Sequence, residues 1–109
     1  MKKYAMGIDI GGTNTAFGLA SSTDKAPSAA ADLIAQDVSV VLGSYGSGVS
    51  IAGSDIFKNA GIPVIGVTCT NPQVTEGNTH YFRICFTDPF QGPVLANYAY
   101  NTLGATTVY

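Results

Sequence analysis

The chain has 109 residues, of which 46% are hydrophobic and 11% are charged, and its formal net charge is −2. This length suits one domain with one modest core, and five scattered basic residues are too few for a nucleic-acid-binding patch. The charged fraction is well below the roughly 25% of an ordinary soluble domain. We therefore expect apolar surface that a partner chain covers, or a sequence cut from something larger.

The amino-terminal residues predict a hairpin followed by a linker. Residues 4–10 have the composition of a strand, residues 11–14 of a tight turn, and residues 15–19 of a returning strand. Residues 20–27 are small and polar and end in proline, which is typical of a linker.

Helices and strands are expected to alternate after the linker. In chain order we expect a helix over 28–36, a strand over 38–43, a helix over 47–60, and strands over 63–67 and 81–86. Ser28 is a candidate N-cap and Gly61 a helix stop. The β-branched apolar runs before and after the second helix are typical of parallel strands buried on both faces.

The last helix, over 88–103, carries the clearest start signal. Asp88 is a candidate N-cap, Pro89 suits the first helical position, and Gln91 completes a capping box. Residues 106–109 are expected to begin a strand. The whole pattern predicts an α/β fold, layered and Rossmann-like, with a mostly parallel sheet and an added N-terminal β-hairpin.

The first candidate site is the turn of the predicted hairpin. Its glycines permit positive φ and let a phosphate approach exposed N–H groups, and an aspartate at the end of a strand can hold a magnesium ion. A simple hairpin turn is the alternative. The residues concerned are Asp9, Gly11, Gly12, Thr13 and Asn14.

Residues 1–20 resemble the amino terminus of bacterial glucokinases and related sugar kinases of the ROK family. The resemblance implies that Asp9 and the Gly11-Gly12-Thr13-Asn14 run contact ATP phosphate. The family's sugar-binding segments, catalytic aspartate, His-Cys zinc cluster and adenosine loops have no counterpart downstream. We therefore expect no catalytic residues, no cofactor and no enzyme activity.

The second candidate site lies in two turns rich in serine, glycine and threonine, at residues 44–48 and 67–72. Each turn follows a predicted parallel strand, and the carboxyl edge of such a sheet is where ligands bind. The helix that begins at Ser47 adds an N-terminus that favours a carboxylate. Turns and caps without a ligand are the alternative.

Residues 30–109 resemble periplasmic binding proteins of the leucine/isoleucine/valine type, chiefly in residues 40–43, 60–65, 70–77, 82–83 and 87–93. The resemblance implies that Ser47, Thr68, Cys69 and Thr70 hold the carboxylate and ammonium of an amino acid. Cys69 stands where a small residue such as alanine is usual, and Gly66-Val67 replaces the usual Ser-Pro. These departures bear on the shape of the site.

Together the two resemblances predict a single chimeric domain made of residues 1–20, a linker over 21–29, and a binding-protein fragment over 30–109. Our main expectation is an artificial or recombined chimera with no evolved function, in which residues 4–10 supply a strand to the sheet. Weak binding of a branched-chain amino acid is the first alternative, and an ATP- or phosphate-binding fragment is the second.

The expected partner is a second copy of the chain, in a homodimer built by exchange of a terminal segment. An open sheet edge and only twelve charged side chains, five basic and seven acidic, offer little to prevent such pairing. No apolar run approaches the roughly 18 residues that span a bilayer, so no membrane partner is expected. Lys2 and Lys3 resemble the start of a secretion signal, but Asp9 interrupts the apolar stretch, and we expect a cytoplasmic location.

The cysteines, the histidine, one arginine and several aromatic residues are also considered as candidate functional residues. Cys69 and Cys85 lack the paired spacing of a zinc site, so no metal is expected, and buried free thiols are favoured over a disulfide. His80 is expected to be structural, and Arg83 to be a surface or paired charge. Four aromatic residues are expected in the core: Tyr81, Phe82, Phe86 and Phe90.

The first prediction follows from the absence of the sugar kinases' catalytic aspartate, which acts as a base, and of their sugar-binding segments. Incubation with glucose and Mg-ATP is expected to give no more sugar phosphate than a protein-free control, because a phosphate loop alone cannot activate the attacking hydroxyl. A coupled enzymatic assay measures the product. Turnover that Asp9→Ala abolishes would contradict this prediction.

Overall fold

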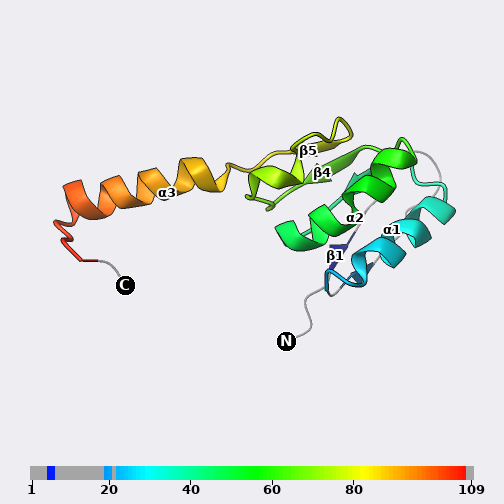
Figure 1. Ribbon diagram of the computed structural model, residues 1–109, viewed down its shortest axis with the longest axis horizontal. Coiled ribbons are helices and arrows are strands. Elements are labelled where there is room, and N and C mark those ends of the chain that lie inside the picture. Colours follow the sequence, from blue (N-terminus) through cyan, green and yellow to red (C-terminus); the bar gives the residue numbers. More distant parts are fainter. Residues whose placement is uncertain (1–4, 7–18, 21, 108–109) are drawn as a thin grey trace.

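A computed structural model of the chain describes residues 5–6, 19–20 and 22–107, and its centre is a three-stranded parallel sheet (Figure 1). The strand order is β3 (Val41–Leu42), β4 (Val64–Gly66), β5 (Tyr81–Arg83). The prediction of an α/β fold with a parallel sheet is confirmed. Each strand is shorter than predicted, since ladder pairing covers only two or three residues of each apolar run.

Two helices pack beside this sheet. Helix α1 (Ala26–Ala35) contacts α2 (Ser47–Asn59), and α2 also contacts β4. The predicted start of α1 is wrong: Lys25 is at the N-cap, and the Ser28 hydroxyl donates to the Lys25 carbonyl oxygen. Pro27 stands in the first helical turn, where its missing N–H costs nothing, so residues 26 and 27 belong to α1 and not to a linker. Helix α2 begins where predicted and ends before Gly61, which has a φ of +72°.

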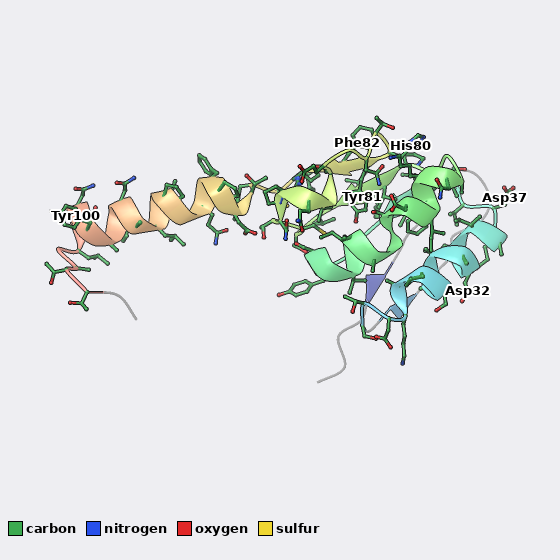
Figure 2. All side chains as sticks on the ribbon, viewed as in Figure 1. Asp32, Asp37, His80, Tyr81, Phe82 and Tyr100 are labelled. Carbon is green, nitrogen blue, oxygen red and sulfur yellow. The ribbon has the colours of Figure 1, made fainter. Side chains whose placement is uncertain are left out.

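The core lies between the sheet and the two helices. Tyr81 is buried as predicted, but Phe82, Phe86 and Phe90 are 54%, 56% and 65% exposed, so the prediction is wrong for these three. Side chains alternate along a strand, which places Phe82 on the face opposite Tyr81 (Figure 2). The buried cluster consists of Ala30, Leu33, Val38, Val41, Phe57, Val64, Cys69, Val74 and Tyr81.

The amino-terminal strands form a sheet of their own. Strand β1 (Ala5–Met6) pairs antiparallel with β2 (Leu19–Ala20), as the predicted hairpin requires, and β2 contacts α1. The expected contribution of this segment to the parallel sheet is wrong for residues 5–6, because they pair with β2 instead. The predicted phosphate turn, Asp9, Gly11, Gly12, Thr13 and Asn14, lies outside the described residues.

The parallel sheet with α1 and α2 is called the lobe below, and a long helix extends away from it (Figure 1). It consists of α3 (Asp88–Asn97) and a π-helical continuation, η2 (Tyr98–Thr102). Its N-cap is Thr87 and not the predicted Asp88, and residues 106–107 are not in the strand predicted over 106–109. Neither part of the helix contributes a buried side chain. Large apolar side chains are exposed along it: Phe90, Val94, Leu95, Tyr98, Tyr100 and Leu103.

The protruding helix makes the molecule elongated. The Cα radius of gyration is 16.6 Å, whereas a compact domain of this length has a radius of about 13 Å. Figure 2 shows Tyr100 near the far end of the helix, away from the labelled residues of the lobe. The apolar side chains of α3 and η2 are therefore not covered by the lobe itself.

Candidate functional site

Two turns meet at the carboxyl edge of the parallel sheet. One follows β3 and leads into α2, and the other follows β4. The Thr68 hydroxyl donates to the carbonyl oxygen of Tyr45 across a distance of 2.8 Å. The Asn71 amide donates to the Ser47 hydroxyl oxygen at 3.3 Å. The structure thus brings Ser47 and the 68–70 segment together, at the edge where the sequence placed them.

The N-terminus of α2 opens at this edge. Gly46 occupies the N-cap in an extended conformation and offers no side chain to cap the helix. The first amide to bond back into the helix is that of Ser50, which donates to the Gly46 carbonyl at 3.1 Å. The N–H groups of Ser47, Gly48 and Val49 therefore lack intrahelical acceptors. Together with the helix dipole they favour an anion in front of the helix.

A buried polar network supports the two turns. Cys69 is completely buried, and its thiol donates to the Ser44 carbonyl at 3.1 Å. Its sulfur also lies 2.9 Å from the Ser50 hydroxyl, which in turn lies 2.6 Å from the Ser44 hydroxyl. Cys69 has no exposed surface for a ligand, so it supports the site instead of lining it. The prediction of a buried free thiol is confirmed for Cys69, whereas Cys85 is free but only partly buried.

Tyr81 completes this network from β5. Its hydroxyl donates to the Gly43 carbonyl at 3.2 Å, and burial raises the pKa of the phenol, which therefore stays neutral. A Cβ on Gly66 would lie 3.1 Å from Tyr81 Cε1 and 3.3 Å from Cys69 Sγ. Glycine at 66 thus leaves the room that cysteine at 69 occupies. The two departures from the expected family pattern fit one another.

Arg83 holds the second turn from the end of β5. Its Nη1 donates to the carbonyl oxygens of Cys69 at 2.8 Å and Asn71 at 2.9 Å. Its Nη2 donates to the Pro72 carbonyl at 2.9 Å and to the Thr75 hydroxyl at 2.6 Å. Arg83 is partly exposed, and it serves the backbone of the turn, a role that the expectation of a surface or paired charge did not include. Sequence reasoning missed this role because backbone carbonyls, the main partners, leave no signature in residue identity.

The remaining candidates lie apart from the two turns. His80 precedes β5, at the opposite edge of the sheet, and its Nδ1 is 3.2 Å from the Thr79 hydroxyl oxygen, which suits the structural role predicted for it. Within residues 5–6, 19–20 and 22–107, no cluster of three His, Cys, Asp or Glu side chains could hold a metal ion. Among the helices described, none is long and apolar enough to cross a membrane.

Comparisons with known proteins point to one family. Residues 19–109 match the periplasmic binding protein family. An amino acid binding protein of Pseudomonas aeruginosa is 41% identical over 78 residues, and Leu/Ile/Val-binding protein homolog 1 of Brucella abortus is 40% identical over 68. These alignments cover 70% and 62% of this chain but 21% and 18% of the relatives. The chain thus spans about a fifth of their length.

Solved structures agree with the observed fold. The leucine-binding protein LivK of Thermotoga maritima superimposes with a TM-score of 0.74 at 38% identity. LivJ of Streptococcus pneumoniae, a branched-chain amino acid transporter substrate-binding protein solved with isoleucine, gives 0.74 at 35% identity. Each comparison covers 78% of this chain and 25% of the other. The family match begins at residue 19, so the linker predicted over 21–29 falls inside it.

The fit between positions 66 and 69 generates a second prediction. Gly66→Ala is expected to destabilise the fold by about 1–3 kcal/mol, because the new Cβ crowds Tyr81 and Cys69. Adding Cys69→Ala removes one of these contacts, so the double variant should be more stable than the sum of the single effects by on the order of 1 kcal/mol. Urea denaturation measures all three variants. Gly92→Ala, with nothing within 4 Å of the new Cβ, is the control, and strict additivity would contradict the prediction.

Proposed function

We propose, since the chain belongs to the periplasmic binding protein family, that its lobe binds a small α-amino acid of the branched-chain type. The observation that carries the proposal is the pair of turns joined by Thr68 and Asn71 in front of the α2 N-terminus. Relatives named for amino-acid and Leu/Ile/Val binding support the choice of ligand.

The hydrogen-bonding capacity of the turns suits both charged groups of an amino acid. The Ser47 hydroxyl accepts from Asn71 N, so its own proton is free to be donated to a carboxylate, beside the open N–H groups of α2. The Thr68 hydroxyl gives its proton to Tyr45 O, which leaves oxygen lone pairs that can accept from an ammonium. Thr70, half-buried in the same turn, is the third proposed contact.

The apolar side chain of the ligand has a neighbour as well. Tyr45 lies in the first turn and is 70% exposed, so its ring is available to an aliphatic group. A ligand on this open surface keeps its outer face in water, which limits the gain from desolvation. We therefore expect a dissociation constant on the order of millimolar, equivalent to about 4 kcal/mol.

The other functional hypotheses have less support. A family match over residues 19–109 favours amino-acid binding over the chimera without evolved function that the sequence suggested. The phosphate-binding alternative rests on the turn from Asp9 to Asn14, which is outside the described residues. The family is described as periplasmic, so the cytoplasmic location expected from the amino terminus has no support from the comparisons.

Titration with L-leucine tests the proposed function. Millimolar leucine should shift the amide resonances of residues 47–49 and 68–71 selectively and saturably, whereas leucinamide, which lacks the carboxylate, should leave 47–49 unmoved. Thr70→Val is expected to weaken binding by tenfold or more, because a hydrogen bond to a charged group is lost. Thr79→Val, an exposed position at the other edge of the sheet, is the matched control. No shifts at tens of millimolar leucine would remove the proposal.

We also propose that α3 and η2 pair with a second copy of the chain. Asp88 is the only charged residue from 88 to 102, so like copies of the helix do not repel one another along their length. Phe90, Val94 and Tyr98 recur every four residues with Leu95 beside them, so these four share one side of the helix. At on the order of 100 Å² each, they give two copies an interface of roughly 800 Å², which suits a weak complex. A two-fold arrangement fits this self-complementary apolar surface.

Sedimentation equilibrium from low to high micromolar concentration tests the pairing. The wild-type chain is expected to show a dimer, and Leu95→Glu, which places a charge in the apolar surface, should give the 11.2 kDa monomer. Ala35→Glu adds the same charge at an exposed position of α1 and should leave the dimer intact. A single species at 11.2 kDa for the wild-type chain would contradict the prediction.

A further inference from the structure

We propose that Arg83 is a positioning residue for the amino-acid site: its guanidinium fixes the backbone of the turn that carries Thr68 and Thr70, and so sets the ligand affinity. The inference rests on the proposed function, which supplies the ligand. It goes further by assigning affinity to a side chain that does not touch the ligand.

The donors of Arg83 are already used within the protein. Nη1 and Nη2 carry four hydrogens in a fixed fork, and four acceptors lie 2.6–2.9 Å from them. The Thr75 hydroxyl lies 3.5 Å from the Pro72 carbonyl and can donate to it, which leaves its lone pair for Arg83. No Nη donor is left for a carboxylate, so the residue acts through the turn.

Four consecutive carbonyls of the turn have partners. Those of Cys69, Asn71 and Pro72 accept from Arg83, and that of Thr70 accepts from the amide of Asp88 at 3.0 Å. Each bond fixes the orientation of one peptide plane. Since residues 69–72 form no strand pairing, these bonds hold the geometry that the sheet would otherwise impose.

Loss of the guanidinium would remove the hydrogen-bond partner of the Cys69 carbonyl and would leave the carbonyls of Asn71 and Pro72 only their bonds from residues 74 and 75. The turn would then exchange among conformations, and ligand binding would have to order it again, which lowers affinity. Lysine cannot replace arginine here, because a single ammonium lacks the planar fork that spans several acceptors. Lysine does retain the charge, so Arg83→Lys separates geometry from electrostatics.

Amide hydrogen exchange without ligand tests the first half of the proposal. The Asn71 amide donates to the Ser47 hydroxyl oxygen, and the amides of Val74 and Thr75 donate to carbonyl oxygens of the turn, those of residues 71 and 72. Arg83→Met should speed their exchange by about tenfold or more, and Arg83→Lys by a smaller factor. The amide of Val64, which donates to His80 O within the sheet at 2.8 Å, is the reference. If Arg83→Met only lowered overall stability, the Val64 amide would exchange faster by the same factor, and that result would overturn the proposal. Unchanged exchange of the amides of residues 71, 74 and 75 would overturn it as well.

Leucine titration of the same variants tests the second half. Arg83→Met is expected to weaken leucine binding by about tenfold. Lys58→Met is the matched control, because Lys58 Nζ also donates to a backbone carbonyl, that of Gly77 at 2.9 Å. Gly77 lies beyond the turn, so Lys58→Met should leave leucine affinity and amide exchange at residues 71–75 unchanged. Unaltered affinity in Arg83→Met would overturn the positioning role. Failure of the wild-type protein to bind leucine would overturn the proposed function, and it is distinguishable because the exchange measurement uses no ligand.

Discussion

The buried side chain of Tyr81 is the contact on which the lobe depends most. It starts on β5, its ring lies close to Gly66 of β4, and its hydroxyl reaches the Gly43 carbonyl just after β3. One side chain thereby links all three strands of a sheet whose ladders are only two or three residues long. Because the phenol stays neutral, this link adds no buried charge.

Because the strands are short, side chains make many of the hydrogen bonds to the backbone of the turns that follow them. The turns at the carboxyl edge begin after two or three paired residues, and their backbone groups need partners from elsewhere. Arg83, Thr68 and Ser47 supply those partners, and Ser44 with Cys69 fills the space beneath. The candidate site is therefore built from side chains that hold backbone, and the α2 N-terminus and the Thr68 oxygen are the groups proposed to face a ligand.

The departures at positions 66 and 69 show how a local substitution is accommodated. Cysteine at 69 is larger than the small residue expected there, and its sulfur fits because residue 66 has no Cβ. The thiol then joins Ser50 and Ser44 in hydrogen bonds that an alanine could not make. The departures at these two positions therefore alter the support below the candidate site.

The sequence by itself determined the class of fold and the edge of the sheet where the two turns of the candidate site meet. Apolar runs, the start of α2 at Ser47 and the stop at Gly61 follow from local backbone and burial preferences, which are written in neighbouring residues. The small and polar residues around Pro27 predict a linker, whereas Pro27 stands in the first turn of α1, a position that proline also favours.

Only the tertiary structure decided what Arg83, Cys69 and Phe82 do. Arg83 binds carbonyls that any residue could supply, the buried Cys69 sulfur occupies space that a side chain at residue 66 would crowd, and Phe82 is exposed on the face opposite the buried Tyr81. The exposure of α3 likewise depends on what the lobe leaves uncovered. The partners of Arg83 and the exposure of α3 depend on segments distant in the chain, and such contacts leave no periodic pattern in the sequence. Alternation puts Tyr81 and Phe82 on opposite faces of β5, but only the packing of the helices decides which face is buried.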